Sequence, residues 1–334
     1  MPPEWPDSNF AVTRIRLILN GGFSGPHAWF CLAQQRGYFA AAGLEIEFIA
    51  GEGAAAVVPL VGHEGIDAGY GDINALAEIA AAHQPGRAPV AVFVMFNAAP
   101  FTIAVRADSA LRSAADLVGS HLSGHRQDAA LKLFPALADR AGFAASSATI
   151  TASPLGLGQQ VRDLLLPGQV DGVFGFVNTI IAAVTPLGLD PARLRFIEFA
   201  DTLPDLYANC LMVSRAWLDR APEQVQGLVA ALNRGLVETL DDLVVAIDAV
   251  ARAAPATDRP VQHRRLAGTL AAEMAHPEGA RIGIGDVDDA RLQRGLDLMA
   301  RTLGWPRVPR SAEVFDRRFL PPLAQRVKSL ARAA

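Results

Sequence analysis

The stretch LAQQRGYFAAAGLEIEF, residues 32–48, decides the fold of this chain. It predicts the end of a helix, a short turn and then a strand. Gly37 and Gly43 bracket the turn, where glycine tolerates the positive φ that ends a helix. From Leu44 to Phe48 apolar and acidic side chains alternate, so one face of the strand is apolar and the other is charged. A helix that leads directly into such a strand is typical of an α/β unit.

The rest of the first hundred residues continues this alternation of strands and helices. Strands are predicted at residues 15–19, 44–49, 67–72 and 90–96, and helices at residues 26–36, 54–61 and 73–82. This order indicates an open, mostly parallel sheet.

A second set of strands and helices follows, and the chain then becomes mostly helical. Strands are predicted at residues 101–105, 148–151, 168–174, 195–199 and 209–214, and helices at residues 127–141, 159–166, 223–253, 261–274 and 289–303. Because 334 residues are many for one core, we expect two lobes.

The composition is that of a well-packed globular protein, with 51% hydrophobic and 19% charged residues. The net charge of −4 gives no basic field, so we expect no nucleic-acid partner. No run of 18 apolar residues occurs, so we expect no transmembrane helix.

Motifs for metal binding or catalysis are absent from the sequence. Cys31 and Cys210 are far apart and form no ligand-spaced set, so we expect two buried free thiols, with a disulfide only if the fold brings them together. His121 and His125 have metal-like spacing only in a helix, whereas a loop is predicted there. Ser24 does not stand in a G-x-S-x-G motif, and no dinucleotide or phosphate-binding glycine motif occurs. We therefore expect no metal, no cofactor and no enzymatic activity.

Short motifs along the chain resemble the solute-binding proteins of ABC importers for nitrate, sulfonates, taurine and thiamine-pyrimidine precursors. The matching pieces are residues 32–48, 113–119, 168–173, 222–231, 283–293 and 319–321. Each piece is short, but their order holds from about residue 13 to residue 322.

This resemblance implies a type II periplasmic-binding-protein fold, with two lobes that carry open, mostly parallel sheets. Two crossovers near residues 100–106 and 205–213 would join the lobes, and a small-molecule ligand would bind between them as they close about this hinge. The implied division is residues 12–102 for the first part of lobe 1, 103–212 for lobe 2 and 213–322 for the second, mostly helical part of lobe 1, with terminal extensions at 1–11 and 323–334.

The same resemblance implies a monomer that presents its closed form to a membrane permease. It also implies a periplasmic location. The N-terminal stretch Met1–Asp7 is polar and proline-rich and lacks the pattern of a secretory signal, so a cytoplasmic location is the alternative.

Candidate ligand-binding residues lie where strands end and helices begin, because ligands of open α/β sheets bind at the carboxyl ends of the strands. The candidates from the first lobe are Asn20, Phe23, Ser24, His27, Trp29, Glu52, Tyr70, Asp72 and Asn97, and those from the second lobe and the crossovers are Phe101, His125, Arg126, Phe174, Phe176, Asn178 and Tyr207. Each has an ordinary alternative, such as core packing for the aromatic side chains and helix capping for Asp72.

These candidates are rich in aromatic rings and short of cations, with Arg126 as the cation. Nitrate or a sulfonate would require several cationic or N–H donors. We therefore expect an aromatic or heteroaromatic solute, such as a thiamine-precursor pyrimidine.

Other functions stay open at this point. A sulfonate, a taurine-like solute or an aromatic acid is the alternative ligand, and a cytoplasmic sensor is the alternative kind of binding protein. A pyrimidine-biosynthesis enzyme on the same fold is the rival of another class. It would need a lysine that holds pyridoxal phosphate, and Lys132 lies in the wrong region for that role.

Overall fold

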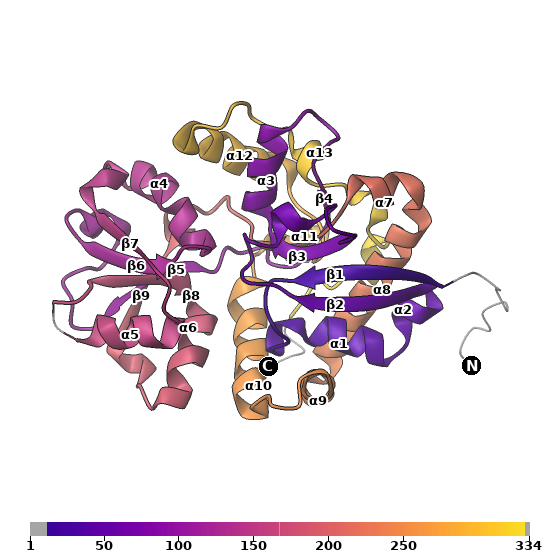
Figure 1. Cartoon of the computed structure of the whole chain (residues 1–334), viewed down its shortest axis with the longest axis horizontal. Coiled ribbons are helices and arrows are strands. Elements are labelled where there is room, and N and C mark those ends of the chain that lie inside the picture. Colours follow the sequence, from indigo (N-terminus) through magenta and orange to yellow (C-terminus); the bar gives the residue numbers. More distant parts are fainter. Residues whose placement is uncertain (1–11, 167, 331–334) are drawn as a thin grey trace.

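The computed structural model describes residues 12–166 and 168–330. It shows two lobes side by side, each built on a five-stranded sheet with helices packed against it (Figure 1). The expected N-terminal extension, residues 1–11, and the last four residues of the C-terminal extension lie outside the described residues. None of the helices in the described ranges is long and apolar enough to cross a membrane.

The first sheet has the strand order β2-β1-β3-β10-β4. Its strands are β1 (Thr13–Leu19), β2 (Leu44–Ala50), β3 (Ala68–Asp72), β4 (Val90–Val94) and β10 (Asn209–Val213). Strand β1 pairs in parallel with β2 and β3, whereas β10 pairs antiparallel with β3 and β4. Four strands therefore run in one direction, and β10 runs against them.

The second sheet repeats this plan in the order β7-β6-β8-β5-β9. Its strands are β5 (Phe101–Arg106), β6 (His121–His125), β7 (Thr149–Ser153), β8 (Gly172–Phe176) and β9 (Leu194–Glu198). Strand β5 is antiparallel to β8 and β9, and the other pairs are parallel. The expected open, mostly parallel sheets are confirmed, and in each sheet the reversed strand is the one that follows a crossover between lobes.

Helices of the first lobe cover its sheet and are α1 (Ala28–Gln35), α2 (Tyr38–Ala41), α3 (Ile73–Ala82), α7 (Arg215–Arg220), α8 (Pro222–Asp241) and α9 (Leu243–Ala253). Those of the second lobe are α4 (Ala129–Ala141), α5 (Leu157–Leu165) and α6 (Val177–Val184). Gly37 and Gly43 have φ angles of 73° and 72°, so both take the left-handed conformation that the sequence predicts around α2.

Several predicted elements differ from the observed ones. Residues 54–61 form turns and a short 3-10 helix, Val58–Leu60, rather than an α-helix, because Pro59 lacks the backbone donor that a helix interior needs. Residues 123–125 lie in β6 instead of a loop. The predicted helix 223–253 is divided at Asp242, whose carboxylate accepts the N–H groups of Val244 and Val245 and thereby starts α9.

The boundaries of the second lobe also differ from those expected at residues 103 and 212. Strand β5 begins at Phe101 in the second sheet. Strand β10 belongs to the first sheet, because it pairs along its whole length with β3. The crossovers therefore lie between β4 and β5 and between β9 and β10.

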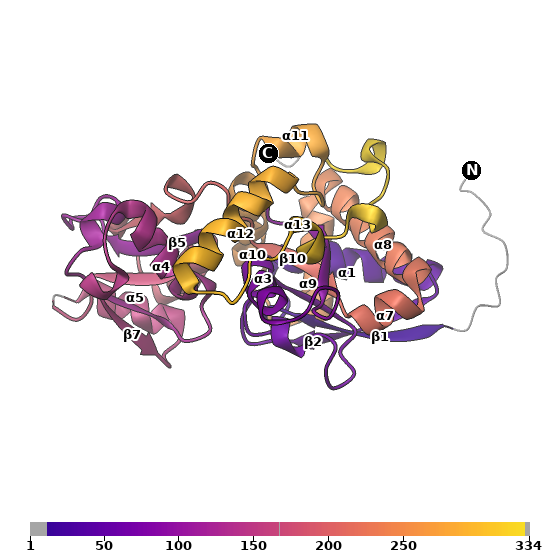
Figure 2. The ribbon, with the colours of Figure 1, turned by 90° about the horizontal axis from the view of Figure 1, so that it is seen from above.

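The C-terminal region carries α10 (Arg259–Gly268), α11 (Glu278–Ile282), α12 (Asp289–Leu303) and α13 (Ser311–Val314). Helix α10 stands between the lobes, where it contacts α6 on one side and the 3-10 helix Gly25–His27 on the other (Figure 1). Helix α12 contacts α3 of the first lobe and α4 of the second (Figure 2). Two C-terminal helices thus contact both lobes.

Both cysteines are buried and free, as expected. Cys31 lies on α1 and Cys210 on β10. Burial raises the pKa of the Cys31 thiol to about 12, so it is protonated and unreactive at neutral pH.

Candidate ligand-binding pocket

A cavity of about 370 Å³ lies between the two sheets at the carboxyl ends of their strands. Its lining includes Asn20 after β1, Glu52 after β2 and Phe96 after β4 from the first lobe, and His125 and Phe176 at the ends of β6 and β8 from the second. This is the position at which open α/β sheets bind ligands.

Helix starts also face this pocket. Asp128 accepts the N–H of Ala130 at 2.8 Å and caps α4, while Asn178 and Thr179 lie in the first turn of α6. The free N–H groups and the dipoles of such helix starts favour anions and hydrogen-bond acceptors.

The C-terminal region closes the pocket on a third side. Arg265 on α10 and Thr269 and Glu273 at the two ends of the following π-helix, Thr269–Glu273, line the cavity. Wide π turns occur frequently at functional sites. The Nδ2 group of Asn178 donates a 3.0 Å hydrogen bond to Glu273 Oε1, which links the second lobe to this segment. Gly268 permits that approach, because a Cβ atom there would lie 2.3 Å from Asn178 Oδ1.

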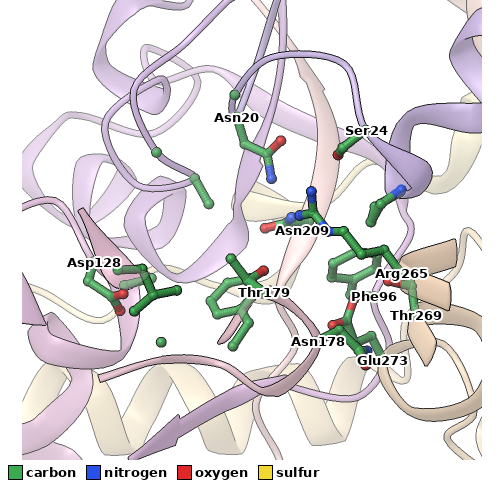
Figure 3. A pocket seen from close by; sticks show the side chains of 18 of the residues that line it. Asn20, Ser24, Phe96, Asp128, Asn178, Thr179, Asn209, Arg265, Thr269 and Glu273 are labelled. Carbon is green, nitrogen blue, oxygen red and sulfur yellow. The ribbon is translucent and has the colours of Figure 1, made fainter. Parts of the chain in front are cut away.

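Arg265 supplies a half-buried positive charge. Burial lowers the pKa of its guanidinium and the nearby Glu273 raises it, yet arginine stays charged at any physiological pH. Its Nε atom is buried without a hydrogen-bond partner in the part of the chain that the structure describes. The guanidinium points into the pocket toward Asn20 and Asn209 (Figure 3). A half-buried guanidinium of this kind is suited to a carboxylate, sulfonate or phosphate.

His27, Ser24 and Asn20 form a hydrogen-bonded group at the first-lobe wall. Nδ1 of His27 lies 3.2 Å from the backbone N of Ser24 and 3.0 Å from its Oγ, and Nε2 lies 2.7 Å from Asn20 Oδ1. Burial, helped by the charge of Arg265, lowers the pKa of His27 to about 3. The imidazole is therefore neutral at physiological pH.

Two carboxyl groups of the lining have raised pKa values. Burial raises the pKa of Asp128 to about 6, against the opposing hydrogen bond from Ala130 N–H. Burial also raises the pKa of Glu273, while its hydrogen bond from Asn178 and the charge of Arg265 oppose the shift. Perturbed carboxyl groups in a cleft are typical of binding and catalytic sites.

The structure brings together part of the predicted candidate set. The candidates that line the pocket are Asn20, Ser24, His27, Glu52, His125, Phe176 and Asn178. Their role in binding stays a prediction.

Other first-lobe candidates lie outside the lining because they pack elsewhere. Trp29 is fully buried in the core. The ring of Phe23 packs edge-on against Phe48 with centroids 5.5 Å apart. Tyr70 is fully buried and its ring packs against His27 rather than lining the cavity.

The remaining polar candidates of the first lobe accept hydrogen bonds from backbone N–H groups instead. Asp72 accepts the N–H of Ala75 at 3.2 Å and caps α3. Asn97 Oδ1 accepts the N–H of His276 at 3.3 Å.

Several candidates of the second lobe and the crossovers also lie outside the pocket lining. The rings of Phe101 and Phe174 are fully buried in the second-lobe core. Tyr207 donates a 3.0 Å hydrogen bond to Glu278 Oε2 in a buried polar group outside the pocket. Arg126 is exposed and lies outside the lining.

The one arginine or lysine in the described lining is Arg265, in place of the expected Arg126. The polar lining residues that were not among the sequence candidates are Gln127, Asp128, Thr179, Asn209, Arg265, Thr269 and Glu273. Residues 261–269, VQHRRLAGT, contain no local signal for this role, since Arg264 directly beside Arg265 is exposed. Only the packing of α10 between the lobes distinguishes the two.

Within the described ranges, no group of three or more histidine, cysteine, aspartate or glutamate residues is placed to hold a metal ion. The described lining contains no lysine either, and Lys132 is exposed on α4.

The family model described as NMT1/THI5 like matches residues 25–242. This chain belongs to the NMT1/THI5-like family. Among its relatives is a curated Legionella pneumophila protein named 4-amino-5-hydroxymethyl-2-methylpyrimidine phosphate synthase. It is 22% identical over 258 residues, which cover 77% of this chain and 79% of the relative.

Solved structures confirm the expected fold. The alkanesulfonate-binding protein SsuA from Xanthomonas axonopodis pv. citri, bound to MOPS, has a TM-score of 0.66 at 20% identity and covers 90% of this chain and 98% of its own. The desulfurization enzyme DszB with biphenyl-2-sulfinic acid has a TM-score of 0.58 at 15% identity and covers 92% of this chain and 98% of its own. At these identities the likeness concerns the fold alone.

The expectation that this chain is not an enzyme is contradicted by the Legionella relative, which is named as a synthase. Absence of familiar catalytic motifs in the sequence did not justify that expectation. Catalytic motifs that belong to other folds do not test for catalysis at an interlobe pocket. Side chains with shifted pKa values are brought to such a pocket from distant segments of the chain, so no short motif records them.

Proposed function

We propose that this chain is the solute-binding component of an ABC-type importer, and that its interlobe pocket takes a small aromatic or heteroaromatic molecule with an anionic group. The observation that carries the proposal is the half-buried guanidinium of Arg265, whose Nε is buried without a hydrogen-bond partner among the described residues and which points into the pocket toward the NH₂ group of Asn20 (Figure 3). Two groups that only donate hydrogen bonds and face one cavity require an acceptor between them.

The size and the apolar part of the lining support a single-ring ligand. The cavity of about 370 Å³ lies at the small end of the range for small-molecule sites. Phe96, Phe176 and Leu157 supply apolar surface beside the polar groups. Aromatic side chains favour a flat ring over an alkyl chain through offset or edge-to-face contacts.

Similar proteins support this choice of ligand class. The relative from Legionella is named for a pyrimidine phosphate, SsuA is described as bound to the sulfonate MOPS, and DszB as bound to an aryl sulfinate. Each of these molecules carries an anionic group and a ring, but the ring of MOPS is saturated and SsuA is named for alkanesulfonates, so these names support the anionic group rather than the aromatic ring. A purely aliphatic sulfonate is the alternative ligand, and it would leave the aromatic lining without a partner.

Isothermal titration calorimetry with three probes tests the ligand class: benzenesulfonate, ethanesulfonate and 4-amino-5-hydroxymethyl-2-methylpyrimidine phosphate. We expect binding of at least one ring-containing anion and weaker binding of ethanesulfonate. Arg265→Gln should weaken the bound probe about 10- to 100-fold, the value of a charged hydrogen bond of about 1.5–3 kcal/mol. Arg264→Gln is the matched control, because Arg264 is exposed beside it.

Two results would contradict this assignment. Tight binding of ethanesulfonate without binding of either ring-containing probe would contradict the proposal that the ligand carries an aromatic ring. Equal affinities of the Arg265→Gln and Arg264→Gln variants would contradict the proposal that Arg265 binds the anionic group of the ligand.

The importer role has its own measurement. We propose that the protein acts in the periplasm and delivers its ligand to a membrane permease after the lobes close. Cells that lack the gene should lose high-affinity uptake of the identified ligand, and fractionation should recover the protein with periplasmic markers. Normal uptake in the deleted strain would reject the importer role.

A synthase-type activity is the second candidate, favoured by the name of the Legionella relative and by the perturbed carboxyl groups of the pocket. Mass spectrometry of the ligand after prolonged incubation with the protein tests it. A new product that requires Asp128 or Glu273 would support catalysis, whereas unchanged ligand would favour transport.

A further inference from the structure

The hydrogen bonds of His27 determine which ring nitrogen carries the proton. The backbone N–H of Ser24 lies 3.2 Å from His27 Nδ1 and can only donate, so Nδ1 accepts. The ring is neutral because burial lowers its pKa to about 3, so its single proton lies on Nε2. The Ser24 hydroxyl, 3.0 Å from Nδ1, then donates to the same nitrogen.

This tautomer fixes the direction of a second hydrogen bond. Nε2–H of His27 donates to Asn20 Oδ1 over 2.7 Å, so the carbonyl end of the Asn20 amide is turned toward His27. Its NH₂ end then points into the pocket, on the side where the guanidinium of Arg265 enters (Figure 3). An asparagine without such a partner can present either end to a ligand.

We propose that His27 is a positioning residue that locks the Asn20 amide with its NH₂ group toward the ligand, so that this corner of the pocket accepts hydrogen-bond acceptors and rejects hydrogen-bond donors. The inference rests on the proposed function and deepens it, since it names the group that selects the anionic end of the ligand. The Ser24–His27–Asn20 chain acts through Asn20, and His27 itself need not touch the ligand.

The chain is anchored on both sides, which makes the lock rigid. His27 is only 3% exposed and its ring packs edge-on against Tyr70. The backbone N–H of Gly25 donates at 2.8 Å to Gln262 Oε1 on α10, the helix that also carries Arg265. The two donor groups of this corner are therefore held by one connected structure.

A pair of matched probes tests the selection: benzenesulfonate, whose sulfonate only accepts, and benzenesulfonamide, whose NH₂ group also donates. A site built to hydrogen-bond one of these groups rejects the other because buried polar groups would be left unpaired. In the wild-type protein we expect benzenesulfonate to bind more tightly. In His27→Phe the Asn20 amide is free to rotate, so the ratio of the two dissociation constants should fall about 10-fold.

The ratio separates positioning from a merely structural role. If His27 only supports the fold, His27→Phe weakens both probes equally and leaves the ratio unchanged, which would overturn the inference. His63→Phe is the matched control, because His63 is exposed and lies outside the lining of this pocket, and it should keep the wild-type ratio.

A second variant guards against misfolding of His27→Phe. In Asn20→Asp one carboxylate oxygen accepts from His27 and the other faces the pocket, so benzenesulfonate should lose affinity and benzenesulfonamide should not. An unchanged preference would overturn the inference.

The tautomer gives a readout without any ligand. In protein labelled with ¹⁵N-histidine, NMR at neutral pH should show the His27 proton on Nε2, and a proton on Nδ1 would overturn the inference. If the wild type binds neither probe, the proposed ligand class fails, while this spectrum still decides whether the Asn20 amide is locked.

Discussion

A buried ion pair at the second crossover gives a stability prediction with a defined size. Arg291 Nη1 lies 3.0 Å from Glu278 Oε1, and both side chains are only 6% exposed. Arg291 also donates to the backbone carbonyls of Pro204 and Leu206 at 3.1 and 2.9 Å, and its guanidinium lies 4.1 Å from the centre of the Tyr207 ring. The pair thus fixes the crossover that leads into β10.

Arg291→Met should lower the free energy of unfolding by about 3–5 kcal/mol, because it leaves the carboxylate of Glu278 buried without its counter-ion. The melting temperature should then fall by roughly 6–10 °C, at about 2 °C per kcal/mol for a protein of this size. Differential scanning calorimetry measures both values. Arg294→Met is the control, since Arg294 pairs with Asp205 at the surface and its loss should matter far less.

The pH dependence of this defect has a definite sign. Burial already raises the pKa of Glu278, and Arg291 opposes that shift. Without Arg291 the folded-state pKa rises further above the unfolded value, so the folded protein binds more protons and its stability falls as pH rises. The defect should therefore shrink as the pH is lowered toward the ordinary carboxyl pKa.

A double variant tests whether the unpaired charge of Glu278 causes the loss of stability. Arg291→Met combined with Glu278→Gln removes the unpaired charge and should recover part of the lost stability. If Arg291→Met is no worse than Arg294→Met, or if the double variant recovers nothing, the buried pair does not stabilise the crossover as argued.

Three further predictions concern the pocket and the core. Gly25→Ala should destabilise the protein by about 1–3 kcal/mol and weaken ligand binding, because a Cβ atom there would lie 2.2 Å from the carbonyl oxygen of Gln262. Gly156→Ala is the control, because Gly156 has open space around it and lies outside the pocket lining, so the melting temperature and the affinity should stay close to those of the wild type. Asp128→Asn keeps a helix cap but removes a carboxyl group whose pKa is about 6. The stability of the wild type should fall as the pH rises from about 4 to 6, because this group loses its proton less readily in the folded protein than in the unfolded chain. The fall should be shallower in the variant, and urea unfolding at several pH values measures it. The Cys31 thiol should react with a thiol reagent only as the protein unfolds, since burial raises its pKa to about 12; fast labelling of the native protein would contradict the described packing of α1.

The fold could be predicted because its elements are specified locally. The alternation from Leu44 to Phe48 fixes β2, and helix α3 has the predicted bounds Ile73–Ala82. The site at the strand ends follows from the fold class, which is why Asn20 and Glu52 line the pocket as candidates named from the sequence alone.

The rest of the site depends on long-range contacts that no short stretch of the sequence predicts. Arg265 and Glu273 reach the pocket only because α10 packs between the lobes, more than two hundred residues from Asn20 in sequence. An aromatic residue near a strand end gives no sign of which way its ring turns, so the sequence could not distinguish the buried Phe101 from Phe176 in the lining. The antiparallel direction of β5 and β10 in their sheets likewise depends on pairing with strands that are distant in sequence.

The position of α10 has a consequence for how the angle between the lobes is coupled to the ligand. Helix α10 contacts α6 of the second lobe and the 3-10 helix Gly25–His27 of the first, and it carries Arg265 into the pocket. A change in the angle between the lobes would have to shift at least one of these two contacts. The charge that faces the ligand therefore stands on the element that an opening of the lobes would strain, so that ligand affinity and lobe geometry depend on a single helix.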